Sequence, residues 1–245
     1  MAERKWVLVT GGSRGIGREI VAELAQRWNV VFTWRTGQQQ SEEVISACCE
    51  LPGWVESVQC DGADINQVRS VTADLLSRHG APHAVIHNAG ITQDGLHLHH
   101  DADSWARVIE TNLNAVFYFN KHLLPDMMAQ RGGAIVLMSS VTAIKGNIGQ
   151  TAYGASKAAM IGLGRSLALE LGRFDIRVNC LLPGLIESDM TRNMPVDALK
   201  ALRKQIALRR LGTAKEVAQA AGFLIGDDSR YMTGQSLILD GGITA

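Results

Sequence analysis

The sequence has no long hydrophobic run, no excess of either charge and no leader-like start. No stretch of about 18 apolar residues occurs, so no helix is expected to span a membrane. The 24 basic side chains balance 24 acidic ones, which argues against a nucleic-acid partner because such proteins usually carry a basic excess. The first residues run directly into the strand-like segment Trp6-Val7-Leu8-Val9, which is too short for a signal peptide. These absences predict a cytoplasmic protein.

Cysteine is scarce as well, and the four that occur fit neither a disulfide framework nor a metal knuckle. Cys48 and Cys49 are adjacent, so free thiols in a reducing compartment are expected. The cluster of His97, His99 and His100 has a pattern that suggests metal ligands, but no further ligand motif or carboxylate pair accompanies it. We expect no metal site.

Only five prolines occur in 245 residues, and there is no linker-like or repetitive tract. The hydrophobic fraction of 46% excludes a disordered or fibrous protein. Short apolar runs alternate with helical patterns along the whole chain. We therefore expect a single domain over residues 1–245.

The strand-like runs are mostly continuous in Val, Ile and Leu, which is typical of a parallel sheet covered on both faces. They lie at 7–10, 30–33, 84–87, 134–138, 176–182 and 236–239, with a weaker one at 55–60. Alternation of such strands with helices predicts an α/β protein with a doubly wound Rossmann fold of about seven strands.

A glycine-rich loop follows the first strand and precedes a helical pattern at 16–27. Glycines in this place let the backbone approach a pyrophosphate, and the helix N-terminus beyond them favours negative charge. A tight structural turn is the plainer alternative, but the strand–loop–helix context favours a dinucleotide site. The expected phosphate-binding residues are Gly11, Ser13, Arg14, Gly15, Ile16 and Gly17.

The second strand ends in Thr33-Trp34-Arg35-Thr36 and lacks the carboxylate that would meet a free ribose 2′-hydroxyl. Arg35 and Arg14 could instead meet a 2′-phosphate, since guanidinium matches phosphate in charge and geometry. Either arginine could also be a solvated surface side chain. We predict NADP(H) as the cofactor.

Tyr153 and Lys157 are spaced to share one face of a long helix that extends to about residue 173. A nearby cation should lower the pKa of the Tyr153 hydroxyl, as suits a general acid. Ser139 and Ser140 follow the strand at 134–138, so both are candidates for a hydroxyl at the carboxyl edge of the sheet.

These residues together resemble the short-chain dehydrogenases/reductases, and most of all their bacterial 3-oxoacyl-[acyl-carrier-protein] reductases. The resemblance covers nearly the whole chain. It rests on the glycine loop and on Asn88-Ala89-Gly90, Asn112, Ser140, Tyr153 with Lys157, and Pro183-Gly184.

The resemblance implies a role for each matching residue. Tyr153 would donate a proton to the substrate carbonyl. Lys157 would lower the pKa of Tyr153 and hold the nicotinamide ribose. Ser140, which is preferred over Ser139 for its distance from Tyr153, would polarise the carbonyl. Asn112 would interrupt its helix and hold a water that links Lys157 to solvent. The remaining implied cofactor contacts are Asp61 (adenine), Asn88, Ala89, Gly90, Pro183, Gly184, Ile186 and Ser188.

Two positions depart from the family pattern. His87 stands where the family usually has asparagine, and we expect it to be a buried, hydrogen-bonded residue. Gly62 stands where an apolar side chain is usual, which makes the adenine contact of Asp61 less secure.

Residues 185–212 are expected to form a lid over the substrate. The stretch 192–215 holds seven basic residues opposed only by Asp197, and it could dock an acidic carrier protein or simply be solvated. Arg131 matches a family position that meets the carrier, whereas Phe174, next to Arg173, occupies the second such position. The resemblance also implies a homotetramer, or a dimer.

Three functions remain open at this point. The first is NADPH-dependent reduction of a 3-oxoacyl thioester, bound to acyl carrier protein or CoA, in fatty acid or polyketide-like synthesis. The second is a dehydrogenase of another small alcohol or ketone, such as a sugar or steroid. The third is an inactive cofactor-sensing protein, which the presence of all four catalytic residues disfavours.

Overall fold

Seven parallel strands form one sheet in the order β3-β2-β1-β4-β5-β6-β7 in the computed structural model, which describes residues 4–188, 191 and 196–245. All seven predicted strands are present, including the weaker third one, and most extend by a residue or two beyond the predicted ends. The strands are β1 (Trp6–Thr10), β2 (Asn29–Trp34), β3 (Val55–Gln59), β4 (Ala84–His87), β5 (Gly133–Met138), β6 (Ile176–Pro183) and β7 (Ser236–Leu239).

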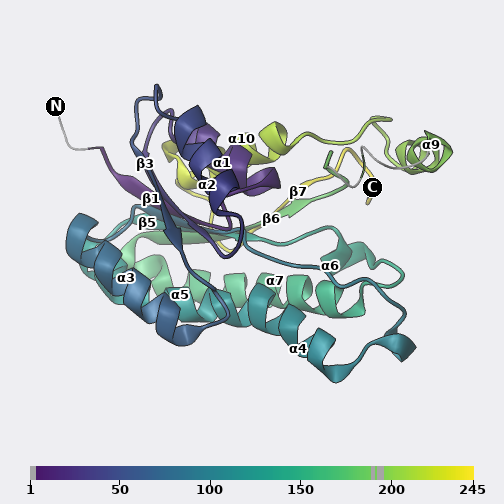
Figure 1. Cartoon of the computed structure of the whole chain (residues 1–245), viewed down its shortest axis with the longest axis horizontal. Coiled ribbons are helices and arrows are strands. Elements are labelled where there is room, and N and C mark those ends of the chain that lie inside the picture. The colour runs from purple at the N-terminus through teal and green to yellow at the C-terminus, as the bar shows by residue number, and fades with distance from the viewer. Residues whose placement is uncertain (1–3, 189–190, 192–195) are drawn as a thin grey trace.

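Helices cover both faces of this sheet (Figure 1). One layer contains α1 (Gly15–Leu24), α2 (Gln38–Ala47) and α10 (Ala214–Ile225). The other contains α3 (Ile65–His79), α4 (Ala102–Ile109), α5 (Ala115–Gln130), the short α6 (Thr142–Lys145) and α7 (Thr151–Leu171). The predicted doubly wound α/β fold is therefore confirmed.

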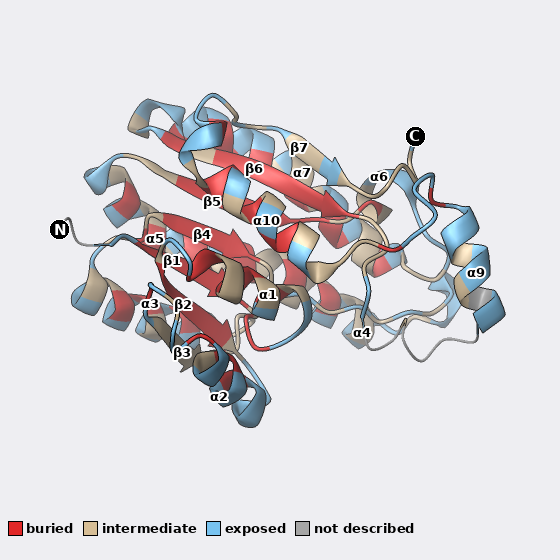
Figure 2. Cartoon of the chain, turned by 90° about the horizontal axis from the view of Figure 1, so that it is seen from above, coloured by how far each residue is buried: buried red, intermediate tan, exposed pale blue. Residues whose placement is uncertain are grey.

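The core is divided by the sheet into two apolar layers. Alternate residues of each strand face opposite layers, so that Leu8 packs with α3, α5 and α7 while Val7 and Val9 pack with α1, α2 and α10. Figure 2 shows the strands as an almost continuous buried band with exposed helix faces outside it. Both faces are covered, which explains why the strands read as unbroken apolar runs.

The chain changes winding direction between β1 and β4, which are neighbours in the sheet. The loops after these two strands diverge to opposite faces, and ligands of such sheets bind in the crevice between them. The glycine loop follows β1, and Asn88 directly follows β4. The fold thus brings both motifs to the same edge.

The segment expected to be a lid leaves the sheet after β6 and carries α9 (Val196–Lys204), which projects from the end of the molecule (Figure 1). A single bridge between Ile186 and Gly212 joins its two ends. Residues 189–190 and 192–195, including Arg192 of the basic stretch, lie outside the described residues.

Candidate active site

A cavity of about 850 Å³ runs along the carboxyl edge of the sheet. It collects residues from the ends of the six strands β1 to β6, from the start of α7 and from the segment after β6. Its wall includes all of the predicted site residues except Asn112: Gly11, Ser13, Arg14, Gly15, Ile16, Gly17, Arg35, Asp61, Asn88, Ala89, Gly90, Ser140, Tyr153, Lys157, Pro183, Gly184, Ile186 and Ser188.

The glycine loop turns tightly against the neighbouring strand end. Gly11 has a φ of 69°, a conformation that glycine adopts readily and other residues rarely do. A Cβ on Gly17 would lie 2.0 Å from the backbone oxygen of Gly11, so no side chain fits there. Asn88 fixes the loop from the other side, because its Nδ2 donates to the backbone oxygens of Thr10 and Gly11 at 3.1 and 2.9 Å.

The N-terminus of α1 opens into this cavity, and Glu19, the acidic residue of α1 in the cavity wall, follows the first turn. Its N-cap residue, Arg14, makes no side-chain capping bond, and the first turn contains no Asp or Glu. The positive end of the helix dipole and the Arg14 guanidinium therefore act in the same direction. Such a loop can accept the phosphates of a dinucleotide.

At the end of β2, exposed Arg35 and partly buried Trp34 both line the cavity. The indole Nε1 of Trp34 is buried and has no hydrogen-bond partner among the described residues. A buried N–H without a partner costs free energy, so Trp34 is an unfavourable point in the packing at the end of β2. Sequence reasoning did not assign Trp34 a role, because its large apolar side chain reads as core.

The two adjacent serines after β5 have different partners. Ser139 is 5% exposed and donates its hydroxyl to the backbone oxygen of Lys157 at 2.7 Å. Ser140 lies in the cavity wall near Tyr153. Taken alone, its hydrogen bond would lower the pKa of the Tyr153 hydroxyl. Both serines line the cavity, but the Ser139 hydroxyl ties β5 to α7, whereas the Ser140 hydroxyl lies near that of Tyr153.

Tyr153 and Lys157 lie one turn apart at the start of α7 and both reach the cavity. Lys157 is 3% exposed, and its Nζ donates to the backbone oxygen of Met138 at 2.7 Å. Burial lowers the pKa of Lys157 to about 8 and raises the pKa of Tyr153. The sequence-based expectation of a lowered Tyr153 pKa is thus wrong for this structure, because burial outweighs the other influences on the phenol and the Asp94 carboxylate adds to it.

Asn112 lies in a π-helical turn, η2 (Glu110–Asn114), which interrupts the helix between α4 and α5 as expected. Its side chain is fully buried and does not reach the cavity. The Oδ1 accepts from the backbone N–H of Ile91 at 2.8 Å, while Nδ2 donates to the oxygen of Ile91 and to Ser156 Oγ. A Cβ placed on Gly90 would be 3.3 Å from both Asn112 Oδ1 and Lys157 Nζ, so only a glycine separates the two groups.

Both departures from the family pattern have a structural reason. His87 is 2% exposed and its Nε2 lies 2.8 Å from Asn120 Oδ1, while burial lowers its pKa to about 4. It is a buried, hydrogen-bonded strand-end residue, as predicted. A Cβ on Gly62 would lie 3.3 Å from the Cβ of Ala115, so the cavity wall beside Asp61 has little room for the usual apolar side chain.

The histidine cluster does not gather metal ligands. Within the part of the chain that the structure describes, no three His, Cys, Asp or Glu side chains are arranged to hold a metal ion. His97 Nδ1 instead contacts Thr151 Oγ1 at 3.2 Å. Among the same residues, no helix has the length and apolar character needed to cross a bilayer.

The fold and the cavity define a Rossmann-type dinucleotide-binding protein with serine, tyrosine and lysine at one end of the site. A family model described as enoyl-(acyl carrier protein) reductase matches residues 11–244. The 3-oxoacyl-[acyl-carrier-protein] reductases of Thermotoga maritima and Chlamydia pneumoniae are 37% and 40% identical to the chain, over 98% of it and over 98% and 97% of their own lengths. That of Pseudomonas aeruginosa is 39% identical over 98% of the chain and 97% of its own length.

With this coverage, the chain belongs to the short-chain dehydrogenase/reductase family. The resemblance found from the motifs is therefore confirmed. The family implies a nicotinamide cofactor, and the cavity offers a phosphate loop at one end and proton-donating groups at the other.

Proposed function

We propose that the protein reduces 3-oxoacyl thioesters to 3-hydroxyacyl thioesters with NADPH, in fatty acid or polyketide-like synthesis. The observation that carries the proposal is one continuous cavity with Arg14 and Arg35 at the phosphate end and Ser140, Tyr153 and Lys157 at the other. The names of the relatives agree with it, since each is a 3-oxoacyl-[acyl-carrier-protein] reductase.

Ser140, Tyr153 and Lys157 would each have a separate role in the reduction of the carbonyl. The bound nicotinamide would supply the hydride. Ser140 would donate a hydrogen bond to the substrate carbonyl oxygen, and Tyr153 would give that oxygen its proton. Because burial raises the pKa of Tyr153, it holds this proton at neutral pH until negative charge develops on the substrate. The Lys157 ammonium would then stabilise the tyrosinate and hold the ribose hydroxyls.

The end of β2 favours NADPH over NADH. A 2′-phosphate carries negative charge that the free ribose lacks, and the strand end offers Arg35 where NAD-binding proteins have a carboxylate. Arg14 lies on the same cavity and offers a second guanidinium. Both guanidinium groups donate hydrogen bonds, which suits a dianionic phosphate.

The remaining predicted contacts keep the roles that the family implies. Asp61 lies in the wall where adenine would sit, although one carboxylate oxygen already accepts from the N–H of Ala63 at 3.0 Å. Ile186 and Ser188 lie in the wall after Pro183-Gly184 and would meet the carboxamide. Asn112 would hold the water that links Lys157 to solvent, next to the Ile91 backbone that its side chain binds.

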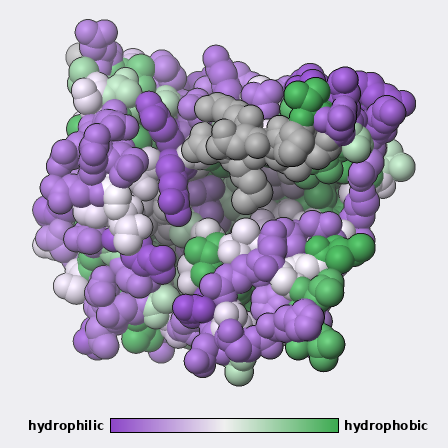
Figure 3. All heavy atoms as spheres, turned by 45° about the vertical axis from the view of Figure 1, so that its right-hand side comes forward, coloured by the Kyte–Doolittle hydropathy of each residue, from purple (hydrophilic) through white to green (hydrophobic). Residues whose placement is uncertain are grey.

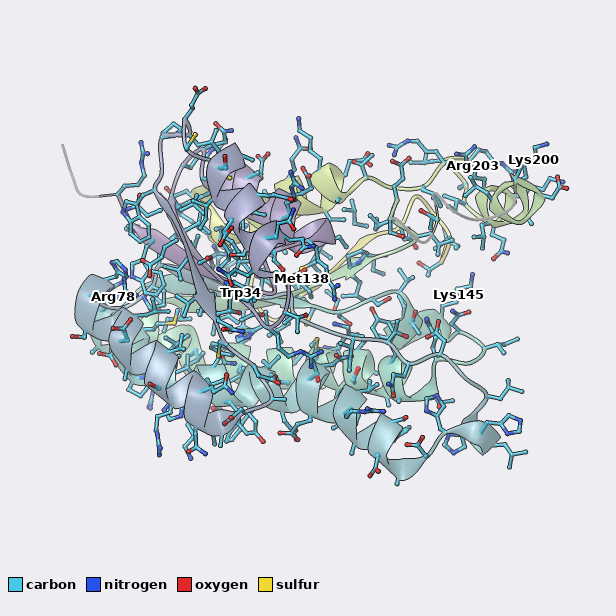
Figure 4. The ribbon with its side chains drawn as sticks, in the orientation of Figure 1. Trp34, Arg78, Met138, Lys145, Lys200 and Arg203 are labelled. Carbon is cyan, nitrogen blue, oxygen red and sulfur yellow. The ribbon has the colours of Figure 1, made fainter. Side chains whose placement is uncertain are left out.

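The lid and a single domain over residues 1–245 remain part of the proposal. The α9 helix carries Lys200 and Arg203 at the same end of the molecule as Lys145 of α6 (Figure 4). Arg210, in contrast, forms an ion pair with Glu216 at 2.6 Å, so not all of the basic stretch is available. The exposed bases fit an acidic carrier protein, and Figure 3 shows this end as mostly hydrophilic with separate hydrophobic patches.

Exposed apolar side chains support a homotetramer. Leu169 of α7 and Phe117 of α5 are 87% and 54% exposed, and Phe223 of α10 and Ile238 of β7 are 42% and 43% exposed. These are the elements that family members use between subunits. The two pairs lie on different elements, as two separate interfaces require.

The deciding experiment follows NADPH oxidation with acetoacetyl-CoA and acetoacetyl-carrier protein, with NADH in parallel. We expect fast turnover with NADPH only, and faster turnover on the carrier. Crotonyl-CoA tests the enoyl reduction that the family model's description suggests, and it should not react. Cofactor binding without turnover of either thioester would contradict the proposal and favour a small alcohol or ketone as the substrate.

A further inference from the structure

A chain of side-chain hydrogen bonds leads from Ser140 to a carboxylate that the proposed mechanism does not use. Ser140 Oγ donates to Thr142 Oγ1 at 3.3 Å and accepts from the Thr142 backbone N–H at 3.2 Å. Thr142 Oγ1 in turn donates to Gln150 Oε1 at 3.4 Å. Gln150 Nε2 donates to both carboxylate oxygens of Asp94, at 3.1 and 3.3 Å.

The direction of this chain follows from which groups can donate. A carboxylate only accepts, so the Gln150 amide must point its nitrogen at Asp94 and its oxygen at Thr142. Asn147 Nδ2 donates to the same oxygen at 3.0 Å and fixes the amide further. A hydroxyl has one hydrogen, so a Thr142 hydroxyl that donates to Gln150 can only accept from Ser140.

Asp94 and Gln150 also connect the loop after β4 with the loop before α7. Asp94 lies in the loop after β4 and Gln150 directly precedes α7. The backbone N–H of Gly95 donates to the oxygen of Gly149 at 2.9 Å, and Thr92 Oγ1 donates to Asp94. The Asp94 charge is near enough to raise the pKa of Tyr153. Asp94 therefore lies near Tyr153 and is also linked to Ser140 through Gln150 and Thr142.

We propose that Asp94 and Gln150 are positioning residues that set the direction of the Ser140 hydroxyl through Thr142. The inference rests on the proposed function, because the group that Ser140 would meet is the substrate carbonyl. When the Ser140 hydrogen turns to that carbonyl, the Thr142 N–H still donates to Oγ and makes the hydroxyl a better donor. Without Gln150, the Thr142 hydroxyl is free to turn round and donate to Ser140 or to the substrate oxygen instead.

The test replaces the two positioning residues and measures steady-state reduction of acetoacetyl-CoA together with NADPH binding. We expect Gln150→Leu and Asp94→Ala each to lower kcat by about 10- to 100-fold, with KM changed less, since a misdirected donor costs mainly the transition state. NADPH affinity, measured by fluorescence titration, should change by less than about twofold because neither residue lines the phosphate end. Gln39→Leu removes a similar glutamine–carboxylate bond on α2 and should leave kcat unchanged.

Asp94→Asn separates the hydrogen bond from the charge. An asparagine oxygen still accepts from Gln150, so this variant should recover kcat to within about threefold of the original protein. The double variant Asp94→Ala with Gln150→Leu should be no slower than the slower single variant, because both break one chain. Three results would overturn the inference. The first is a double variant whose loss of kcat is the product of the two single losses. The others are an Asp94→Asn variant as slow as Asp94→Ala, and a Gln150→Leu variant with kcat within about threefold of the original.

If Gln150→Leu does not fold, the comparison of Asp94→Ala with Asp94→Asn is enough to test the positioning role. The two proposals also fail in different ways. No turnover of acetoacetyl thioesters by the unmodified protein would overturn the proposed function itself. Normal turnover that is insensitive to Gln150 and Asp94 would overturn only the positioning role.

Discussion

The Nζ of Lys157 lies 5.5 Å from the centre of the Tyr153 ring, but it donates its hydrogen bond to the backbone oxygen of Met138. The lysine is thus held beside the phenol by the end of β5. Burial lowers the pKa of Lys157 to about 8 and raises that of Tyr153, so Tyr153 remains protonated at neutral pH. A proton donor needs this state before the reaction begins.

Tyr153→Phe removes the proposed proton donor and little else. We expect kcat to fall by about a thousandfold or more, at the level of losing general acid catalysis. NADPH binding, followed by fluorescence, should stay within about threefold, since the ring remains in place. Tyr231→Phe is the matched control, because Tyr231 is fully exposed. Retained activity in Tyr153→Phe would rule out this mechanism.

Arg35→Ala tests whether Arg35 recognises the 2′-phosphate of NADPH. Loss of a charge-assisted hydrogen bond costs about 1.5–3 kcal/mol, which corresponds to about 10- to 100-fold in the Kd for NADPH. The Kd for NADH should hardly change. Arg69→Ala, which removes an exposed arginine on α3, serves as the control. Equal losses for both cofactors would show that Arg35 does not recognise the phosphate.

The rate of reduction should depend on pH through Lys157. Its lowered pKa means that the ammonium is present below about pH 8 and is lost as the pH rises through that value. Because the ammonium stabilises the tyrosinate that forms, kcat should be level near pH 7 and fall about tenfold between pH 7.5 and 9. Lys157→Met should be slow at every pH. A profile of the original protein that stays level to about pH 9.5 would contradict this role.

Gly17→Ala should destroy the phosphate loop. The new Cβ would lie 2.0 Å from the backbone oxygen of Gly11 and 2.6 Å from Asn88 Nδ2, so the loop must move. We expect loss of measurable NADPH binding and a Tm lower by several degrees, measured by calorimetry.

Gly162→Ala provides the contrast. Gly162 is an exposed helical residue of α7 with nothing within 4 Å of an added Cβ. The same substitution should there stabilise the helix by about 0.5–1 kcal/mol and leave NADPH binding intact. Equal behaviour of the two variants would show that the loop tolerates a side chain.

Leu169→Lys tests the proposed assembly. A lysine at this 87% exposed position would introduce a desolvated charge into the α7 interface. Light scattering should find a tetramer for the original protein and dimers for the variant. Leu98→Lys is the control, because Leu98 is 88% exposed but lies outside α5, α7, α10 and β7. An unchanged mass for Leu169→Lys would exclude α7 from the interface.

Local sequence patterns predicted most of the fold and much of the site. The glycine loop, the Tyr153–Lys157 spacing and the apolar strands are each set within a few residues, where chain geometry is regular. The choice between Ser139 and Ser140 depended on the family spacing. The structure adds a bond between Ser139 and the backbone of Lys157, which no local pattern encodes.

The sequence by itself determined the parallel sheet, the phosphate loop and the helix face that carries Tyr153 and Lys157, since short-range sterics and periodicity decide such features. Only the tertiary structure decided that burial raises the pKa of Tyr153, that the Trp34 N–H is buried without a partner among the described residues, and that Gln150 links Thr142 to Asp94. These features arise where segments far apart in the chain exclude water together, and the free energy of a buried donor or charge depends on all of its neighbours at once.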